Sequence, residues 1–240
     1  MDETSRPGGP IAARELHFIW ICDCSGSMDE NGKIQSLNRA VREALPHVKD
    51  AANSNPEAKV LMRVVAFSDS ARWLVSTPTP LENFIWTDLT AVGETAMGAA
   101  MKLVADGLKI PPMPQRGLPP ALVLMTDGQP TDDFNNGLKA LMETPWGRHS
   151  RRIAVAIGGD AKRDNLVKFI GNSEIKVLEA NNPESLAKQI KFLSTMAVSG
   201  ISPVVNPTVD PVVPPIPVPV PDPVSPEPLP GAAPGSDVEW

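Results

Sequence analysis

Leu16-His17-Phe18-Ile19-Trp20-Ile21-Cys22, a largely apolar run, leads directly into the polar turn Asp23-Cys24-Ser25-Gly26-Ser27. An apolar run of this length without polar alternation predicts a strand that is buried on both faces of a sheet. The turn then places one carboxylate and two hydroxyl groups at the carboxyl end of that strand. Mg²⁺ prefers oxygen ligands and keeps waters or an outside carboxylate in positions that the protein leaves open. The turn therefore predicts part of a cation site, with the remaining ligands supplied later in the chain.

Short apolar runs alternate with longer amphipathic stretches along the next 170 or so residues, which is typical of βα units. This alternation predicts a doubly wound α/β fold, with a mostly parallel six-stranded sheet and helices on both faces. The predicted strands are Leu16–Asp23, Lys59–Phe67, Ala71–Ser76, Ala121–Thr126, Arg152–Ile157 and Lys176–Leu178. The predicted helices are Ile34–Ala52, kinked at Pro46, Ala96–Gly107, Phe134–Glu143, Arg163–Ile170 and Pro183–Ala197.

The third strand is expected to be antiparallel and to lie at an edge of the sheet. Only Ser68-Asp69-Ser70 separates it from the strand before it, which is too short for a crossover helix and suits a tight hairpin. The segment Pro78–Gly93 has no clear period, so we expect a long ordered loop with Phe84, Ile85 and Trp86 buried. This loop would bring its far end back to the carboxyl edge of the sheet.

Three polar segments are expected to meet at that edge, because open α/β sheets bind ligands beyond the carboxyl ends of their strands, where strand order reverses. The first is the opening turn, the second is Gly93–Gly98 at the start of a helix, and the third is Thr126-Asp127-Gly128. Each segment alone is more typical of a turn or a helix cap than of a metal site; the three together predict a metal site. The predicted metal ligands are Asp23, Ser25, Ser27, Thr95 and Asp127. The predicted ion is Mg²⁺, or another dication such as Mn²⁺ or Ca²⁺.

The composition changes after Lys191: no Lys or Arg follows it, and 13 of the 27 prolines lie between Pro203 and Pro234. Such a stretch cannot pair in a sheet or continue a helix, and it predicts an extended polyproline II tail. We therefore expect a disordered N-terminus over residues 1–13 and a single domain over 14–199. A disordered proline-rich tail with an acidic C-terminal peptide is expected over 200–240.

The charge distribution argues against nucleic-acid binding. The net charge is −6, and residues 192–240 carry −5 of it, so the domain is close to neutral and offers no basic face. No stretch has the length of a signal peptide core or of a membrane span, which predicts a cytoplasmic protein without membrane contact.

Several other conspicuous side chains receive structural interpretations. Cys22 and Cys24, the only cysteines, are expected to pack in the core on one side of the strand while Asp23 points to the other. His17 and His47 are interpreted as surface residues, which leaves the site without a general base. Trp146 and the basic stretch Arg148-His149-Ser150-Arg151-Arg152 are interpreted as an exposed, solvated turn before the fifth strand.

With these motifs in place, the chain resembles a von Willebrand factor A domain. The metal-ion-dependent adhesion site of that family has the pattern Asp-x-Ser-x-Ser, a threonine on a second loop and an aspartate after the fourth strand, and all five positions are filled here. Phe67–Trp73, Thr126–Asp133 and Ala154–Gly158 are further similar to the bacterial TerY-like branch, named for tellurite resistance. That resemblance implies a cytosolic adaptor in stress or defence systems that contain a protein kinase and a PP2C-type phosphatase. A cysteine-rich zinc module found in some members is replaced here by the proline-rich tail.

Three functions are compatible with the sequence. The first is a non-enzymatic module whose bound metal captures an Asp or Glu carboxylate of a partner protein. A second makes the proline-rich tail the recognised element, since such segments dock in aromatic-lined grooves. The third is Mg²⁺-dependent phosphoryl transfer, which the sequence disfavours because it contains no phosphate-binding loop of the Gly-x-x-x-x-Gly-Lys-Ser/Thr type.

Overall fold

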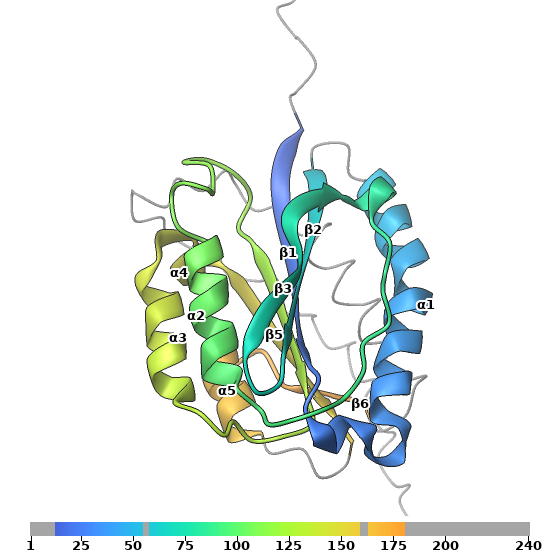
Figure 1. The fold of residues 1–240 in the computed structure, drawn as a ribbon. Coiled ribbons are helices and arrows are strands. Elements are labelled where there is room, and N and C mark those ends of the chain that lie inside the picture. The colour runs from blue at the N-terminus through green and yellow to red at the C-terminus, as the bar shows by residue number, and fades with distance from the viewer. Residues whose placement is uncertain (1–12, 55–57, 159–162, 181–240) are drawn as a thin grey trace, which may run out of the picture.

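A computed structural model describes residues 13–54, 58–158 and 163–180. In this part of the chain six strands form one sheet in the order β3-β2-β1-β4-β5-β6 (Figure 1). The strands are β1 (Arg14–Asp23), β2 (Ala58–Phe67), β3 (Ala71–Pro80), β4 (Ala121–Thr126), β5 (Arg151–Ile157) and β6 (Leu178–Ala180). All neighbours are parallel except β2 and β3, which form the predicted antiparallel hairpin at one edge.

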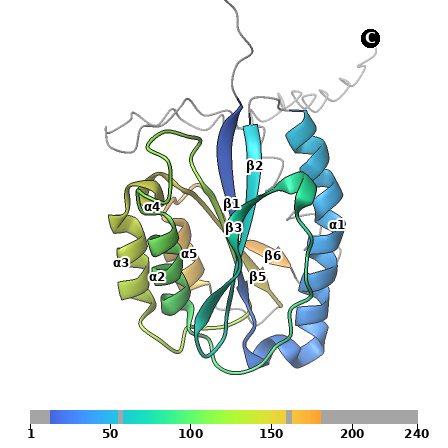
Figure 2. The same cartoon turned by 45° about the horizontal axis from the view of Figure 1, so that its top comes forward.

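Helices lie on both faces of the sheet, as predicted. Figures 1 and 2 show α1 on one side and α2, α3, α4 and α5 on the other. The helices are α1 (Lys33–Asn53), α2 (Met97–Gly107), α3 (Phe134–Glu143), α4 (Pro145–His149) and α5 (Asp164–Ile170), with 3₁₀ segments η1 (Gly26–Gly32) and η2 (Leu81–Asn83). The chain moves outward from β1 in both directions, so the strand order reverses between β1 and β4.

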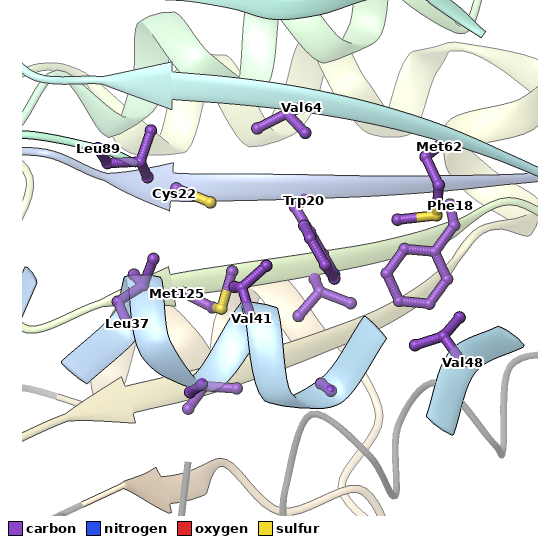
Figure 3. Packing of buried hydrophobic residues seen from close by; sticks show 14 of the residues in the cluster. Phe18, Trp20, Cys22, Leu37, Val41, Val48, Met62, Val64, Leu89 and Met125 are labelled. Atoms are coloured by element: carbon purple, nitrogen blue, oxygen red, sulfur yellow. The ribbon is translucent and has the colours of Figure 1, made fainter. Parts of the chain in front are cut away.

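The position of β1 at the centre of the sheet explains its apolar sequence. Its residues alternate between two cores, because successive strand side chains point to opposite faces. Phe18, Trp20 and Cys22 pack with α1, where Leu37 and Val41 approach them (Figure 3). Ile19 and Ile21 belong to the core beneath the other four helices, together with Met97, Met101 and Phe169.

The helix layer over the second core is held together by a close backbone approach between α2 and α3. A Cβ atom added to Gly137 would lie 2.3 Å from the Gly98 carbonyl oxygen. This distance is far below ordinary van der Waals contact, so the two helices can pack this closely only because both positions are glycine.

Several element boundaries differ from the predicted ones. β3 continues four residues past Ser76 to Pro80, where it still pairs with Leu61 of β2, and β6 lies two residues later than predicted. α1 runs through Pro46 as one element. In the loop after β3, Phe84 is buried as expected, whereas Ile85 is 82% exposed. The predicted helix Pro183–Ala197 and the tail lie outside the described residues.

Two side chains interpreted as exposed are in fact buried. Trp146 is fully enclosed in the second core, and its indole Nε1 donates a hydrogen bond to the Pro114 carbonyl oxygen at 2.8 Å. The unpredicted helix α4, capped by the Thr144 hydroxyl, turns the indole inward. His17 is only 4% exposed because it lies on the same face of β1 as Ile19 and Ile21, the face that the second core covers. Burial, followed by the charge of Arg63, lowers the pKa of His17 to about 4.

The basic stretch before β5 is only partly the solvated turn that the sequence suggested. Arg148 is exposed, but Arg152 is half-buried. The guanidinium of Arg152 donates to the carbonyl oxygens of Gly147, Phe169 and Ile170. This side chain therefore links α4 to the carboxyl end of α5.

Candidate metal centre

Asp23 ends β1 at the carboxyl edge of the sheet and anchors the candidate site. Its backbone pairs with Phe67 of β2, and its side chain is completely buried. One carboxylate oxygen accepts a hydrogen bond from the Ser25 amide at 2.8 Å, and the other accepts one from the Thr126 hydroxyl. The carboxylate therefore ties the turn after β1 to the end of β4.

A chain of side-chain hydrogen bonds connects the two predicted serines to Asp127. The hydroxyl oxygens of Ser25 and Ser27 lie 3.1 Å apart. The Ser27 hydroxyl in turn donates to Asp127 Oδ1 at 2.9 Å. Residues separated by a hundred positions in the sequence are thus brought into one polar cluster at the switch point between β1 and β4.

The threonine loop reaches the cluster because its backbone is bonded to the turn after β1. The Gly26 amide donates to the Gly93 carbonyl at 2.8 Å, and the Val92 amide donates to the Cys24 carbonyl at 2.7 Å. Gly93 has a φ of +83°, and a Cβ atom there would collide with the Asp69 carboxylate at 2.5 Å. This turn therefore requires glycine. In Figure 1 the loop crosses the lower edge of the sheet, where β1 ends.

A second set of bonds fixes Thr95 against the loop after β4. The Thr95 amide donates to the Thr131 hydroxyl at 3.1 Å, and the Thr131 amide donates to the Thr95 carbonyl at 3.0 Å. The Asp132 carboxylate accepts from the amides of Gly98 and Ala99 at 2.7 Å each, at the start of α2. Carboxylates favour this position because the first amides of a helix have no partner within it.

The surroundings of Gly128 show that the Thr95 and Ser27 hydroxyls lie near the same point of the loop after β4. A Cβ atom on Gly128 would lie 3.7 Å from Thr95 Oγ1 and 3.9 Å from Ser27 Oγ. The five predicted residues therefore surround one small region. Among the described residues no three His, Cys, Asp or Glu side chains gather as a metal site, so a cation here would depend on hydroxyl as well as carboxylate oxygens. This donor set suits a hard dication.

Two residues of the cluster were missed by the sequence analysis. The Thr126 hydroxyl donates a hydrogen bond to Asp23, as described, and its oxygen also accepts one from the Gly128 amide at 3.1 Å. Lys33, the first residue of α1, donates from Nζ to Asp127 Oδ2 at 2.7 Å, and both side chains are buried. Thr126 could have been inferred from its place beside Asp127. Lys33 had no such signal, because its direction depends on the turn at Asn31 and Gly32.

The environment of the carboxylates favours a bound cation. Burial raises the pKa of Asp23, the hydrogen bonds from Thr126 and Ser25 lower it in part, and the negative charge of Asp127 raises it again. Two buried carboxylates in one cluster are costly without a neutralising charge. Part of that charge comes from Lys33, and the cluster still has one more negative than positive group.

The cysteines beside the cluster are structural, as expected. Cys22 and Cys24 both belong to the core beneath α1, and their Sγ atoms are buried. Burial, followed by the charge of Asp23, raises the pKa of the Cys24 thiol to about 12. Thiols with raised pKa values are poor nucleophiles and poor metal ligands at neutral pH.

Comparisons with known proteins agree with this architecture. The structure is similar to a von Willebrand factor type A protein from Catenulispora acidiphila (TM-score 0.59, 20% identity, 78% of this chain and 43% of that one). It is similar to the pilus adhesin SpaC of Lactobacillus rhamnosus GG (TM-score 0.62, 12% identity, 78% and 31%). It is also similar to proximal thread matrix protein 1 of the mussel byssus with a zinc-occupied MIDAS motif (TM-score 0.55, 17% identity, 78% and 46%).

The match covers less than half the length of each of these three structures. No curated protein matches the chain. At identities of 20% or lower, these structural likenesses concern the fold. The sequence itself matches the family model of the von Willebrand factor type A domain over residues 19–191. This range includes β1 from Ile19 onward, the other five strands and all five predicted ligands, so the chain belongs to the von Willebrand factor type A domain family.

Proposed function

We propose that this chain is a non-enzymatic protein–protein interaction module that binds an Asp or Glu carboxylate of a partner through a dication. The proposed ion is Mg²⁺, with Mn²⁺ or Ca²⁺ as substitutes, and the proposed ligands are Asp23, Ser25, Ser27, Thr95 and Asp127. The observation that carries the proposal is the gathering of these oxygen donors, from three loops, at the switch point of the sheet.

The surroundings of the cluster support capture of an outside group. The proposed ligands are buried or half-buried, but exposed residues adjoin them in each loop: Gly26, Glu94 and Gln129. An ion held there would be supported from below by the protein and would face solvent on its outer side. A carboxylate of a partner is a suitable ligand for such an open position.

Phosphoryl transfer has less support from the geometry. His17 lies six residues before Asp23 on β1, about 20 Å away at 3.3 Å per residue. His47 lies fourteen residues after Lys33 on α1, about 21 Å along the helix axis. His149 precedes β5, at the opposite edge of the sheet from the cluster. None of these imidazoles is placed to act as a general base at the proposed metal.

The proposed cellular setting is the TerY-like one that the sequence motifs imply. In this proposal the partners are a protein kinase and a PP2C-type phosphatase of a bacterial stress or defence system, in the cytoplasm. In the described part of the chain no helix is long and apolar enough to cross a membrane. Co-purification of the chain with each candidate partner, in Mg²⁺ and in excess chelator, tests this setting.

The decisive experiment is metal-dependent partner capture by matched variants. The wild-type chain is expected to retain its partner in Mg²⁺ and to lose it in chelator, while Asp127→Asn is expected to lose it in both. Asp106→Asn is the control, because Asp106, on the last turn of α2, is exposed and pairs with Lys109. Capture by Asp127→Asn at the wild-type level, in a protein with an unchanged circular dichroism spectrum, would contradict the proposed function.

A further inference from the structure

Lys33 places a buried positive charge within the candidate metal centre. Its Nζ lies 2.7 Å from Asp127 Oδ2, and the exposed fractions of the two side chains are 7% and 1%. The other oxygen of Asp127 accepts the hydrogen bond from Ser27. Asp127 is thus bonded on one side to a proposed metal ligand and on the other to an ammonium group.

The local backbone directs Lys33 toward the centre. Asn31 and Gly32, the last two residues of η1, have φ values of 54° and 70°, and two consecutive residues with positive φ form a tight turn directly before α1. Ser27 lies within η1 and Lys33 begins α1, so one short segment carries both partners of Asp127. Lys33 reaches the cluster as a consequence of this turn.

The net charge of the candidate centre, with and without a dication, depends on Lys33. Asp23 and Asp127 together carry −2 when ionised, and Lys33 reduces this to −1. A dication would make a centre without Lys33 neutral, whereas with Lys33 the loaded centre carries +1. A centre with a residual positive charge attracts an anionic ligand more strongly than a neutral one does.

We propose that Lys33 is a resident counter-cation that weakens metal binding at this centre and strengthens the binding of a partner carboxylate to the loaded centre. The inference rests on the proposed function and identifies a residue that sets its balance. If the ammonium stays in place when the metal binds, the two cations repel each other. If it moves away, its ion pair with Asp127 is lost. Metal affinity is lowered in either case.

The test is metal titration of three purified full-length variants by isothermal calorimetry, with Mn²⁺ and Mg²⁺ as the probes at constant ionic strength. Lys33→Met removes the charge and keeps much of the side-chain volume. Lys33→Arg retains the charge. Lys109→Met is the matched control, because it makes the same change in net charge at a side chain that is 62% exposed and pairs with Asp106 on α2.

We expect Lys33→Met to bind Mn²⁺ about tenfold to a hundredfold more tightly than the wild-type chain, as removal of a unit charge a few ångströms away predicts. Lys33→Arg and Lys109→Met should keep roughly the wild-type affinity. Circular dichroism of Lys33→Met without metal checks that the fold is retained. If it is not, Lys33→Gln, which can still bond Asp127, takes its place. Equal or weaker Mn²⁺ binding by the folded, uncharged variant overturns the proposal.

A second measurement addresses the carboxylate. Acetate is titrated into the Mn²⁺-saturated proteins, and the water-proton relaxation rate reports the displacement of water from the ion. We expect half-saturation at a lower acetate concentration in the wild-type chain than in Lys33→Met. Equal acetate affinities would overturn the second half of the proposal. If the wild-type chain binds metal and Lys33→Met binds it equally well, only this inference is overturned. If neither the wild-type chain nor any variant binds metal, the proposed function is overturned as well.

Discussion

At the scale of single residues, the imidazole of His17 makes the stability of the domain depend on pH. The side chain is buried beside Arg63, and its pKa in the folded protein is about 4, against 6.5 for an ordinary histidine. In the described part of the chain neither ring nitrogen has a hydrogen-bond partner. The exposed carboxylate of Glu15 lies 3.9 Å from Nε2, too far to offset the burial.

We expect this residue to destabilise the domain as the pH falls below about 6.5. The folded-state pKa is lower than the unfolded one, so protons bind preferentially to the unfolded chain. The free energy of unfolding therefore has its full value above pH 6.5. It declines as the pH falls toward 4, by about 3 kcal/mol in total. Urea unfolding at pH 7.5 and pH 5.0 measures the change. His17→Met should show a much smaller change, and His47→Gln, at an exposed position of α1, should behave like the wild type.

The same residue shows where sequence reasoning stops at this scale. Asp23, Ser25 and Ser27 could be placed together because their spacing lies within one turn after an unmistakable strand. The burial of His17 and Trp146 depends on which strands and helices cover them, and a polar or lone aromatic residue gives no local sign of that. The direction of the Lys33 side chain likewise depends on the φ angles of Asn31 and Gly32, which the identity of residue 33 does not specify.

At the scale of elements, apolar runs predicted the existence and type of nearly all described helices and strands, whereas their ends depend on pairing. β3 extends to Pro80 because β2 offers it a partner as far as Leu61. β6 begins at Leu178 because its register against Val155 begins there. The short helix α4 was missed because its five residues have no amphipathic period. None of these differences moves the candidate site, which lies at the well-predicted carboxyl ends of β1 and β4.

The contact between α2 and α3 is an element-scale property that can be tested directly. Gly137→Ala would place a Cβ atom 2.3 Å from the Gly98 carbonyl oxygen and 2.7 Å from the Gly98 Cα. These are backbone atoms, so the helices must separate. We expect the clash to lower the free energy of unfolding by about 1–3 kcal/mol, as for an overpacked core. The better helix propensity of alanine offsets up to about 1 kcal/mol of this loss.

Urea unfolding of Gly137→Ala and of Lys139→Ala makes the comparison. Lys139 lies on the same helix with its side chain 75% exposed, so its substitution should change stability by less than about 0.5 kcal/mol. Gly98 also donates its amide to Asp132 at the start of α2, next to the Thr95 loop. Gly137→Ala should therefore weaken Mn²⁺ binding as well. Wild-type stability in this variant would mean that the helix separation is not limited by these glycines.

At the scale of the whole molecule, the switch in strand order couples the candidate centre to the stability of the fold. Three loops that are far apart in the sequence meet where β1 and β4 end. Backbone hydrogen bonds from Gly26 to Gly93 and from Thr131 to Thr95 hold them to one another. In the unfolded chain these donors are separated and bind a dication weakly. A ligand that binds the folded state preferentially stabilises it according to its concentration and affinity.

We therefore expect Mg²⁺ or Mn²⁺ to raise the melting temperature of the chain. At a hundredfold excess of free metal over Kd the stabilisation is about 2.7 kcal/mol, or about 5–10 °C for a domain of this size. Asp127→Asn should lose this increase, since one proposed ligand charge is gone, and Asp106→Asn should retain it. Differential scanning calorimetry across a metal series provides the measurement, with chelator as the reference. An unchanged melting temperature in wild-type protein at saturating metal would mean that the three loops do not form a metal centre, because a folded-state ligand cannot bind there without shifting the unfolding equilibrium.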